Sequence, residues 1–391
     1  MRDAGSEQIP VAPATALDPH LVEQIRALAT RCDGPFYVYQ QALIEHSCRE
    51  FLTLPYADKS IHFASMANAN RRFLEIVRAT GLRIFVNSPG HLALVREVGF
   101  AGHEIVYTAS AMDDGQLRLA HDAGAIVNLD SLGQLAAWRR LFGAEPVGLR
   151  CNIGELVDPR PTRAGYFLGK HSRLGLTVDE IESLAQSEGI AGLHVYVGTD
   201  LLDLDYFRDC YVHLARLAKL FPKLWFIDFG GGFGLPHDHD APFAFETYRP
   251  LVTELMTRLS AELGRSIRLI LEPGRIIGGA AGYFVCRVTD VKLRGDQQLI
   301  GVNASSTQFP RPLFYPEEAR HPVTLLAGAD HNVRRSSIYG CSTYSRDFLA
   351  RDLPLPTARV GDLIVLGQAG SYCSAAHTLF LGFAPPTEYF I

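Results

Sequence analysis

Eight short apolar segments between residues 61 and 272 alternate with stretches of helical pattern, and this alternation constrains the fold more than any other feature. Each segment is rich in β-branched or aromatic residues, as expected of a strand that is buried on both faces. The predicted strands are Ile61–Ala64, Arg83–Val86, Glu104–Tyr107, Ile126–Leu129, Val147–Asn152, Gly192–Tyr196, Leu224–Asp228 and Arg268–Glu272.

The stretches between these strands have helical periodicity. The clearest one places six apolar side chains on a single stripe: Phe207, Tyr211, Leu214, Leu217, Ala218 and Phe221. Repeated strand–helix units imply parallel strands that are joined by right-handed crossovers. Eight such units within about 220 residues predict a closed (β/α)8 TIM barrel.

The pattern changes near Gly278, because strands now follow one another without long helices between them. These strands are predicted at Val285–Val291, Gln298–Val302 and Leu363–Leu366. They indicate a C-terminal β-rich domain, similar to a sandwich or a barrel. We therefore expect an N-terminal extension over residues 1–34 that belongs partly to the β-domain, a barrel domain over 35–280 and a β-domain over 281–391.

Composition excludes several classes of protein. The chain is 47% hydrophobic and 20% charged, with a formal net charge of −5 and no basic block, which argues against nucleic acid or an anionic membrane as its main partner. We find neither a signal-peptide pattern nor an apolar run of about 18 residues. The seven cysteines are scattered and form no C-x-x-C pair, so we expect no disulfide framework and a cytoplasmic location.

Two motifs lie where predicted barrel strands end, which is where such a fold carries its functional groups. Successive glycines in Gly230–Gly232 allow backbone N–H groups to converge on an anion, although a tight turn explains the run equally well. In the motif Glu272-Pro273-Gly274-Arg275, the glutamate can accept a hydrogen bond from a protonated ring nitrogen. Its arginine can bind a phosphate as a fork, and the plain alternative is an internal ion pair.

Further motifs follow in order along the chain. They are Ser172-Arg173-Leu174-Gly175, Arg311-Pro312-Leu313-Phe314-Tyr315, the segment from Asp347 to Asp352, Gly370-Ser371-Tyr372 and Phe380-Leu381-Gly382-Phe383. Together with the two motifs above, they resemble the fold-type III decarboxylases that depend on pyridoxal phosphate (PLP). These enzymes have an alanine-racemase-like barrel and act on diaminopimelate, ornithine or arginine. The resemblance extends from about Pro35 to the C-terminus.

The resemblance implies a set of binding residues. Thr199, Gly230–Gly232, Arg275 and Tyr372 would hold the PLP phosphate. Glu272 would pair with the pyridine nitrogen. In members similar to diaminopimelate decarboxylase, Arg311 would contact the substrate carboxylate. The resemblance also implies a homodimer in which the C-terminal domain of one subunit completes the site of the other.

The sequence departs from the family pattern at the positions that act on the substrate. Met66 stands in the place of the lysine that forms a Schiff base with PLP, and a thioether cannot form an imine. In the same alignment, Phe85 replaces an aspartate near the ring and Tyr196 replaces the histidine that stacks on it. Thr343 and Tyr344 replace the catalytic cysteine and the acidic residue after it.

Other lysines offer few substitutes. Lys59 begins the strand that ends near Met66, so it should point to the opposite end of the barrel. Lys219 and Lys223 fall on or after a helix. Lys170, in the loop before Ser172, stays open as a substitute.

Several histidines have a simpler interpretation than a functional one. The segment His237-Asp238-His239-Asp240 alternates possible metal ligands, but a solvated turn explains it better, and we predict no metal site. His62 and His194 lie within predicted strands, where we expect core histidines with satisfied hydrogen bonds.

We therefore predict a divergent decarboxylase-like enzyme of a specialised biosynthetic pathway, which acts on an amino-acid-derived carboxylate in the former PLP pocket without a lysine Schiff base. PLP binds non-covalently or not at all. In the second case Tyr196, Arg311, Thr343 and Tyr344 supply the polar groups, with tyrosine as a proton donor and arginine as a carboxylate anchor. Two alternatives stay open: a non-catalytic binding or regulatory subunit, and a true PLP decarboxylase whose lysine was replaced artificially at position 66.

Overall fold

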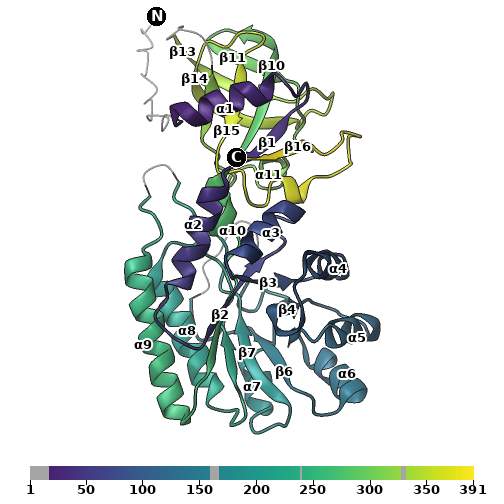
Figure 1. The fold of residues 1–391 in the computed structure, drawn as a ribbon, viewed down its shortest axis with the longest axis vertical. Coiled ribbons are helices and arrows are strands. Elements are labelled where there is room, and N and C mark those ends of the chain that lie inside the picture. The colour runs from purple at the N-terminus through teal and green to yellow at the C-terminus, as the bar shows by residue number, and fades with distance from the viewer. Residues whose placement is uncertain (1–16, 159–166, 238–239, 327–331) are drawn as a thin grey trace, which may run out of the picture. The chain divides into compact units, whose positions relative to one another are not determined.

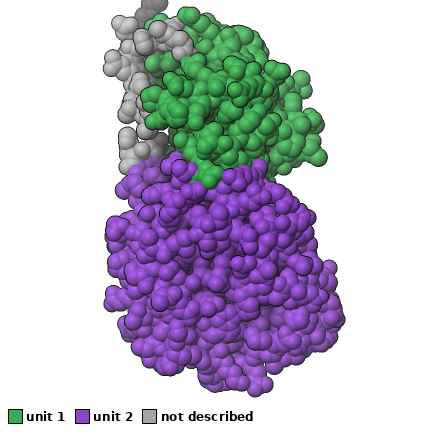
Figure 2. Space-filling model, viewed as in Figure 1, with its two compact units in different colours: residues 1–41, 279–391 green, residues 42–278 purple. Residues whose placement is uncertain are grey.

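The computed structural model describes residues 17–158, 167–237, 240–326 and 332–391, which form two compact units (Figures 1 and 2). Unit 2 is the continuous segment 42–278. Unit 1 combines residues 1–41 with residues 279–391, so the chain leaves this unit early and returns to it after the barrel.

Unit 2 is a closed barrel of eight parallel strands in sequence order. The strands are β2 (Lys59–Ala64), β3 (Arg83–Val86), β4 (Ile105–Thr108), β5 (Ile126–Leu129), β6 (Val147–Cys151), β7 (Ile190–Val195), β8 (Phe226–Asp228) and β9 (Arg268–Leu271). The predicted barrel is confirmed, and every strand end lies within two residues of its predicted position.

Helices connect the strands of the barrel (Figure 1). They are α2 (Gln41–Leu52) before β2, then α3 (Arg71–Ala79), α4 (Pro89–Val98), α5 (Asp114–Asp122), α6 (Leu132–Phe142), α7 (Val178–Ser183), α8 (Leu204–Ala218) and α9 (Phe245–Leu263), with the short α10 (Arg275–Gly278) after β9. Most begin at a side chain that accepts backbone N–H groups of the first turn, as Asn70 does for α3. The apolar stripe predicted on α8 is buried. Within the described residues, no helix has both the length and the apolar character that a membrane span requires.

Two glycines on neighbouring strands make room for one aromatic ring inside the barrel. A Cβ atom on Gly192 would lie 2.2–2.3 Å from ring atoms of Phe226, and one on Gly148 would lie 2.8 Å from the Cζ atom of the same ring. The ring belongs to a buried apolar cluster of Ala64, Phe85, Val106, Ile126, Ala191, Phe226 and Ile270. This level of the barrel is therefore a packed core, and polar groups are left to the strand ends.

Unit 1 is β-rich, which confirms the predicted second domain. Its main sheet runs in the order β12-β15-β10-β11-β13-β14. These strands are β10 (Gly282–Arg294), β11 (Gln297–Val302), β12 (Val323–Leu326), β13 (Val333–Tyr339), β14 (Phe348–Pro356) and β15 (Leu363–Leu366), and the short helix α11 (Arg311–Phe314) lies between β11 and β12. Strands β12, β13 and β14 were not predicted.

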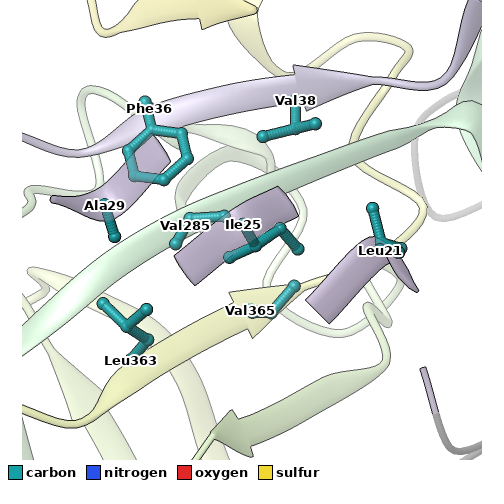
Figure 3. Packing of buried hydrophobic residues seen from close by; sticks show 8 residues of the cluster. All are labelled: Leu21, Ile25, Ala29, Phe36, Val38, Val285, Leu363 and Val365. Carbon is teal, nitrogen blue, oxygen red and sulfur yellow. The ribbon is translucent and has the colours of Figure 1, made fainter. Parts of the chain in front are cut away.

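The boundary between the units differs from the one expected after residue 34. Strand β1 (Phe36–Tyr39) pairs antiparallel with β10 and parallel with β16 (Thr387–Phe390), so it belongs to unit 1, and the boundary falls after Gln41. Helix α1 (Pro19–Ala29) also packs within this unit (Figure 3). Leu21, Ile25 and Ala29 of this helix belong to a buried apolar cluster. The other members of the cluster are Phe36, Val38, Val285, Leu363 and Val365.

Candidate functional site

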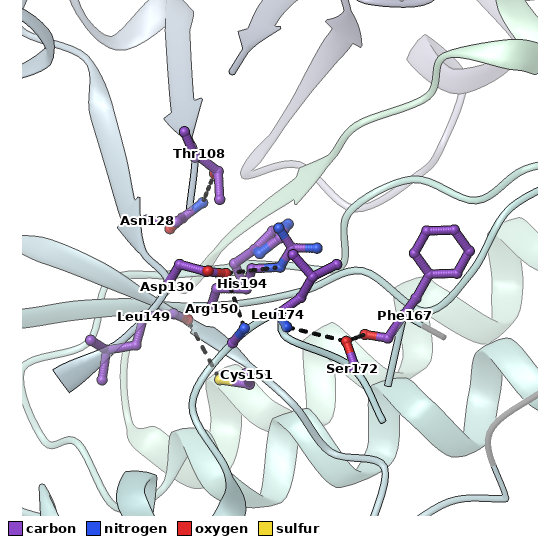
Figure 4. A network of polar contacts seen from close by, with 12 residues as sticks. Thr108, Asn128, Asp130, Leu149, Arg150, Cys151, Phe167, Ser172, Leu174 and His194 are labelled. Carbon is purple, nitrogen blue, oxygen red and sulfur yellow. Dashed lines mark hydrogen bonds and ion pairs between the residues drawn. The ribbon is translucent and has the colours of Figure 1, made fainter. Parts of the chain in front are cut away.

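Buried polar side chains of several barrel strands are hydrogen-bonded to one another, as Figure 4 shows for Thr108 and Asn128. Nδ2 of Asn128 on β5 donates to Oγ1 of Thr108 on β4 at 3.1 Å and to Oδ2 of Asp228 on β8 at 3.3 Å. Oδ1 of Asp228 accepts the backbone N–H of Gly230 at 2.9 Å. The start of the glycine run is therefore tied to the polar centre of the barrel.

His194, Asp228 and Glu272 form a buried cluster at this centre, with one possible ligand atom from each within 4.8 Å of the others. Nε2 of His194 lies 3.4 Å from Oε2 of Glu272. Both ring nitrogens of His194 and Oε1 of Glu272 have no hydrogen-bond partner among the described residues. A buried polar atom without a partner costs about 1–3 kcal/mol, so the cluster is suited to a water molecule or a polar ligand group.

The two strand histidines therefore differ. His62 is a core histidine as predicted, because its ring contacts Oγ of Ser60 at 3.0 Å and the carbonyl of Ile84 at 3.2 Å. His194 is also buried as predicted, but the expectation of satisfied hydrogen bonds is wrong, because its ring nitrogens have no hydrogen-bond partner among the described residues. The reason is its neighbours: His194 faces carboxyl groups from β8 and from the end of β9 rather than backbone carbonyls.

Burial sets the protonation of the cluster. It raises the pKa of Asp228 well above its usual range, and the nearby Glu272 raises it further. Burial also raises the pKa of Glu272, to about 7, against the effects of a hydrogen bond with Asp228 and of the Arg150 charge. For His194, burial lowers the pKa to about 4. At neutral pH, His194 is therefore neutral and Glu272 is near its midpoint, and burial favours the protonated form of Asp228.

Replacing Glu272 by glutamine is expected to change how stability depends on pH. Because the folded state raises the pKa of Glu272, its contribution to stability is full below about pH 4.5 and is lost as the pH rises through 7. His194 has the opposite sign, because its lowered pKa costs stability as the pH falls from 6.5 through 4. Urea unfolding at several pH values should show the stability of wild type, relative to Glu272→Gln, falling by on the order of 2 kcal/mol between pH 4.5 and 7. If the difference in stability between wild type and Glu272→Gln is the same at pH 4.5 and pH 7, the raised pKa of Glu272 is contradicted.

The glycine run packs closely against neighbouring backbone. Gly230 and Gly232 have φ of +64° and +106°, and a Cβ atom on Gly230 would lie 2.2 Å from the carbonyl oxygen of Val195. A Cβ atom on Gly231 would lie 2.4 Å from the carbonyl oxygen of Glu272 and 3.8 Å from the ring of Tyr196. The structure thus places the glycine run, Tyr196 and Glu272 together. The close packing of the run is already a sufficient reason for glycine at these positions, with or without a bound anion.

Arg275 faces a carboxylate that the sequence analysis missed. Its Nε lies 3.4 Å from Oδ1 of Asp200, in the loop after β7. Oδ1 also accepts the backbone N–H of Leu235 at 3.0 Å, and Oδ2 lies 3.0 Å from Nε2 of His237. Burial alone would raise the pKa of Asp200, but the hydrogen bond with His237 and the charge of Arg275 lower it to about 2. Arg275 therefore forms the internal ion pair that the sequence analysis gave as the alternative to phosphate binding.

His237 contacts the carboxylate of Asp200 and, through its backbone, the side chain of Asp240. The backbone N–H of His237 donates a hydrogen bond to Oδ2 of Asp240 at 3.2 Å. The backbone N–H of Asp240 donates a hydrogen bond to the carbonyl oxygen of His237 at 2.9 Å. Asp238 and His239 lie outside the described residues.

Met66 follows β2 and packs, partly buried, against the apolar cluster that contains Phe85. The two residues that the resemblance sets in place of a lysine and an aspartate therefore border one apolar region. The ring of Tyr196 is 5.0 Å from that of Phe167 in an edge-to-face arrangement. Thr199 lies in the same loop as Asp200, close to the glycine run.

The lysines lie mostly away from the carboxyl ends of the strands. Lys59 begins β2, and its Nζ donates to the carbonyl of Tyr56 at 3.2 Å. Lys219 and Lys223 pair with Glu262 and Glu188 around the outer helices. Lys170 is exposed in the loop after β6, so it remains the open substitute.

The other candidate residues lie in unit 1. Thr343 is exposed, and Tyr344 packs edge-to-face against Phe380 with 5.5 Å between ring centroids. Arg311 is only 5% exposed, with Nη1 3.5 Å from Nε2 of His321. Tyr372 has φ of +58°, which is unusual for a residue with a side chain. The structure therefore brings Thr343 and Tyr344 together on one loop and places Arg311 and Tyr372 elsewhere in the unit.

The buried Asp347 fixes the loop that carries Thr343 and Tyr344. Oδ1 accepts the backbone N–H of Ser306 at 2.6 Å and the hydroxyl of Ser305 at 3.2 Å. Oδ2 accepts the backbone N–H of Ser342 at 3.1 Å and the hydroxyl of the same serine. One carboxylate thus connects the two ends of a turn to the segment after β11.

Comparisons with known proteins give the family. Residues 41–279 match the model of the pyridoxal-dependent decarboxylase, pyridoxal binding domain. The probable chloroplastic diaminopimelate decarboxylase of Oryza sativa subsp. japonica is 30% identical over 377 residues, covering 91% of this chain and 75% of that protein. The diaminopimelate decarboxylase of Methanothermobacter thermautotrophicus is 28% identical, covering 93% and 88%.

Solved structures agree in fold. Diaminopimelate decarboxylase from Helicobacter pylori, complexed with L-lysine, has a TM-score of 0.84 at 20% identity, with 94% of each chain covered. Lysine/ornithine decarboxylase from Vibrio vulnificus, complexed with putrescine, has a TM-score of 0.82 at 19% identity and covers 96% of this chain and 99% of that one. With a barrel, a polar centre and a family model that spans most of the barrel unit, this chain belongs to the pyridoxal-dependent decarboxylase family.

Proposed function

We propose that this protein is an enzyme of the decarboxylase family that acts on an amino-acid-derived carboxylate at the carboxyl ends of the barrel strands, without a lysine-bound cofactor. One observation carries the proposal: the barrel keeps a buried cluster of His194, Asp228 and Glu272 with polar atoms that lack protein partners. Keeping such a cluster costs stability, which is expected of a site that binds a ligand and not of a purely structural core.

The residues present fit PLP in part. Oε1 of Glu272, without a hydrogen-bond partner among the described residues, suits the pyridine nitrogen. The backbone of the glycine run suits a phosphate group, but Arg275 is already paired with Asp200. Met66 does not fit the covalent link, because its side chain has no amine. The fit therefore supports non-covalent binding, and when bound, PLP supplies a ring that accepts the electrons left by a departing carboxylate.

The side chains of this protein have separable tasks in this proposal. Burial and the closeness of the two carboxyl groups favour a proton on the pair of Asp228 and Glu272, and Oε1 of Glu272 is the candidate acceptor for a ligand donor. Tyr196, beside Gly231, is a candidate proton donor. For Arg311, Thr343 and Tyr344, which lie in unit 1, the roles of carboxylate anchor and of polar groups remain predictions from the resemblance.

The apolar region around Met66 supports a natural protein without the lysine. An artificial replacement of one lysine would account for Met66 but not for Phe85, which belongs to the cluster that Met66 borders. Among the relatives, bound L-lysine and putrescine support an amino-acid-like or amine ligand. A homodimer with a shared site and a cytoplasmic location remain predictions.

A titration with PLP tests the absence of a lysine link. Wild type is expected to show no visible absorbance from a lysine-linked pyridoxal, whereas Met66→Lys gains it, because partial burial lowers the pKa of the new amine and leaves more of it uncharged. Met66→Gln is the control, since it adds polarity without an amine. Borohydride reduction followed by peptide mass spectrometry should label position 66 in Met66→Lys only. A label on Lys170 in wild type would contradict the proposal that the protein has no lysine-bound cofactor.

A screen of amino acids with and without PLP separates the remaining alternatives. Carbon dioxide release or another change of an amino-acid substrate supports the enzyme. Amino-acid binding without turnover in either condition would instead support the non-catalytic binding subunit. The codon for residue 66 in the source genome decides whether the methionine is natural.

A further inference from the structure

We propose that Asp200 is an internal anion that takes the place of a phosphate group at Arg275, so that the site selects amine or amino-acid ligands without a phosphate. This inference rests on the proposed function, because it concerns the same site. It names a residue that determines specificity, and it gives the class of ligand that the residue excludes.

The contacts of Asp200 are those that a bound anion would make. A guanidinium nitrogen of Arg275 lies 3.4 Å from Oδ1, the backbone N–H of Leu235 donates to the same oxygen at 3.0 Å, and Nε2 of His237 lies 3.0 Å from Oδ2. These are the donor types that bind phosphate in proteins: an arginine, a backbone amide and a histidine. The carboxylate thus accepts the amide of Leu235, contacts the His237 ring and forms an ion pair with Arg275, as a phosphate at this position would do.

The backbone holds Asp200 against the glycine run. The N–H of Leu201 donates to the carbonyl of Gly232, and the N–H of Gly234 donates to the carbonyl of Leu201, both at 2.9 Å. A Cβ atom on Gly234 would lie 2.5 Å from the carbonyl carbon of Asp200. The two loops are therefore in direct contact, and the backbone at Asp200 is held beside the glycine run by this pairing.

Charge makes the two anions exclude one another. Arg275 and Asp200 compensate each other, so the pair offers a phosphate no net positive charge. Both side chains are mostly buried, where water screens the repulsion between two anions poorly. The pKa of Asp200, lowered to about 2, keeps the carboxylate charged at neutral pH. A phosphate at Arg275 must therefore displace a charged and hydrogen-bonded side chain.

The test compares ligands with and without the phosphate. Calorimetry should measure the Kd of PLP, pyridoxal and inorganic phosphate for wild type, Asp200→Asn and Asp205→Asn. Asparagine keeps an acceptor for Leu235 and tolerates the φ of +59° at this position, so the loop should be retained. Asp205→Asn, at an exposed site in the first turn of α8, is the matched control for the loss of one negative charge.

Wild type and Asp205→Asn are expected to bind PLP and pyridoxal with similar Kd, whereas Asp200→Asn binds PLP and inorganic phosphate more tightly by on the order of tenfold to a hundredfold. If wild type prefers PLP strongly and Asp200→Asn leaves that preference unchanged, the inference is overturned. It is also overturned if Asp200→Asn binds inorganic phosphate no better than wild type. A failure of the proposed function gives another result: amino acids and pyridoxal do not bind to any variant, yet Asp200→Asn still binds inorganic phosphate more tightly than wild type does.

Discussion

Replacing Asp347 by alanine is expected to destabilise unit 1 by about 4 kcal/mol, because the change leaves four donors without their acceptor. Two of these donors are the backbone N–H groups of Ser306 and Ser342, and the other two are the hydroxyls of Ser305 and Ser342. Alanine offers no acceptor, and the aspartate is only 1% exposed, so water cannot replace it without opening the turn.

The two units allow separate readouts of this effect. Both tryptophans, Trp138 and Trp225, lie in unit 2, so tryptophan fluorescence follows the barrel. Hydrogen exchange of peptides from β13 and β14 follows unit 1. We expect Asp347→Ala to accelerate exchange in these strands. The control is Asp352→Asn, which removes the charge of an exposed ion pair with Arg335, tolerates the φ of +55° at this position and should cost less than about 1 kcal/mol. Equal exchange in both variants would refute the role of Asp347.

Replacing Gly192 by alanine is the second change with a large expected effect, a loss of about 3 kcal/mol or more from the barrel. The new Cβ atom would lie 2.2–2.3 Å from ring atoms of Phe226, so the ring must move. Since the ring is buried within the apolar cluster, its movement strains the core. Urea unfolding followed by tryptophan fluorescence measures the loss.

Two further variants make this prediction specific. Gly90→Ala places a methyl group in open space within α4 and should leave stability unchanged or raise it slightly. Phe226→Leu removes part of the ring, so the double variant with Gly192→Ala should recover stability relative to the sum of the single changes. If the two changes add without recovery, the ring is not what excludes the side chain at position 192.

The barrel could be predicted because its strands have a strong local signal. Each is a short apolar run bounded by helical stretches, and burial on both faces leaves little ambiguity. The strands of unit 1 carry weaker signals. β13 is largely polar, with Arg334, Arg335, Ser336 and Ser337 in succession, and β14 contains Pro354 and Pro356, which argue against a strand in sequence alone.

The site was predictable only where a motif marks it. The glycine run and the segment from Glu272 to Arg275 follow predicted strands, and the structure places both at the carboxyl ends of the barrel. Asp200 and Asp228 were missed because neither stands out among 42 acidic residues. Their properties come from residues distant in sequence: Arg275, for example, is 75 positions after Asp200, and only folding brings the two together. His194 was misjudged for the same reason.

The parallel pairing of β1 with β16 has a consequence for synthesis on the ribosome. Phe36 pairs with Thr387, so β1 emerges long before β16 can join it, and the whole barrel is translated in the interval. Since translation adds about 5–20 residues per second, a barrel with mostly sequential strand contacts has many seconds to form first. During that time β1 exposes unpaired backbone groups on both of its edges, because β10 also emerges only after the barrel. The nascent chain should therefore depend on chaperones most strongly while β1 waits for these two strands.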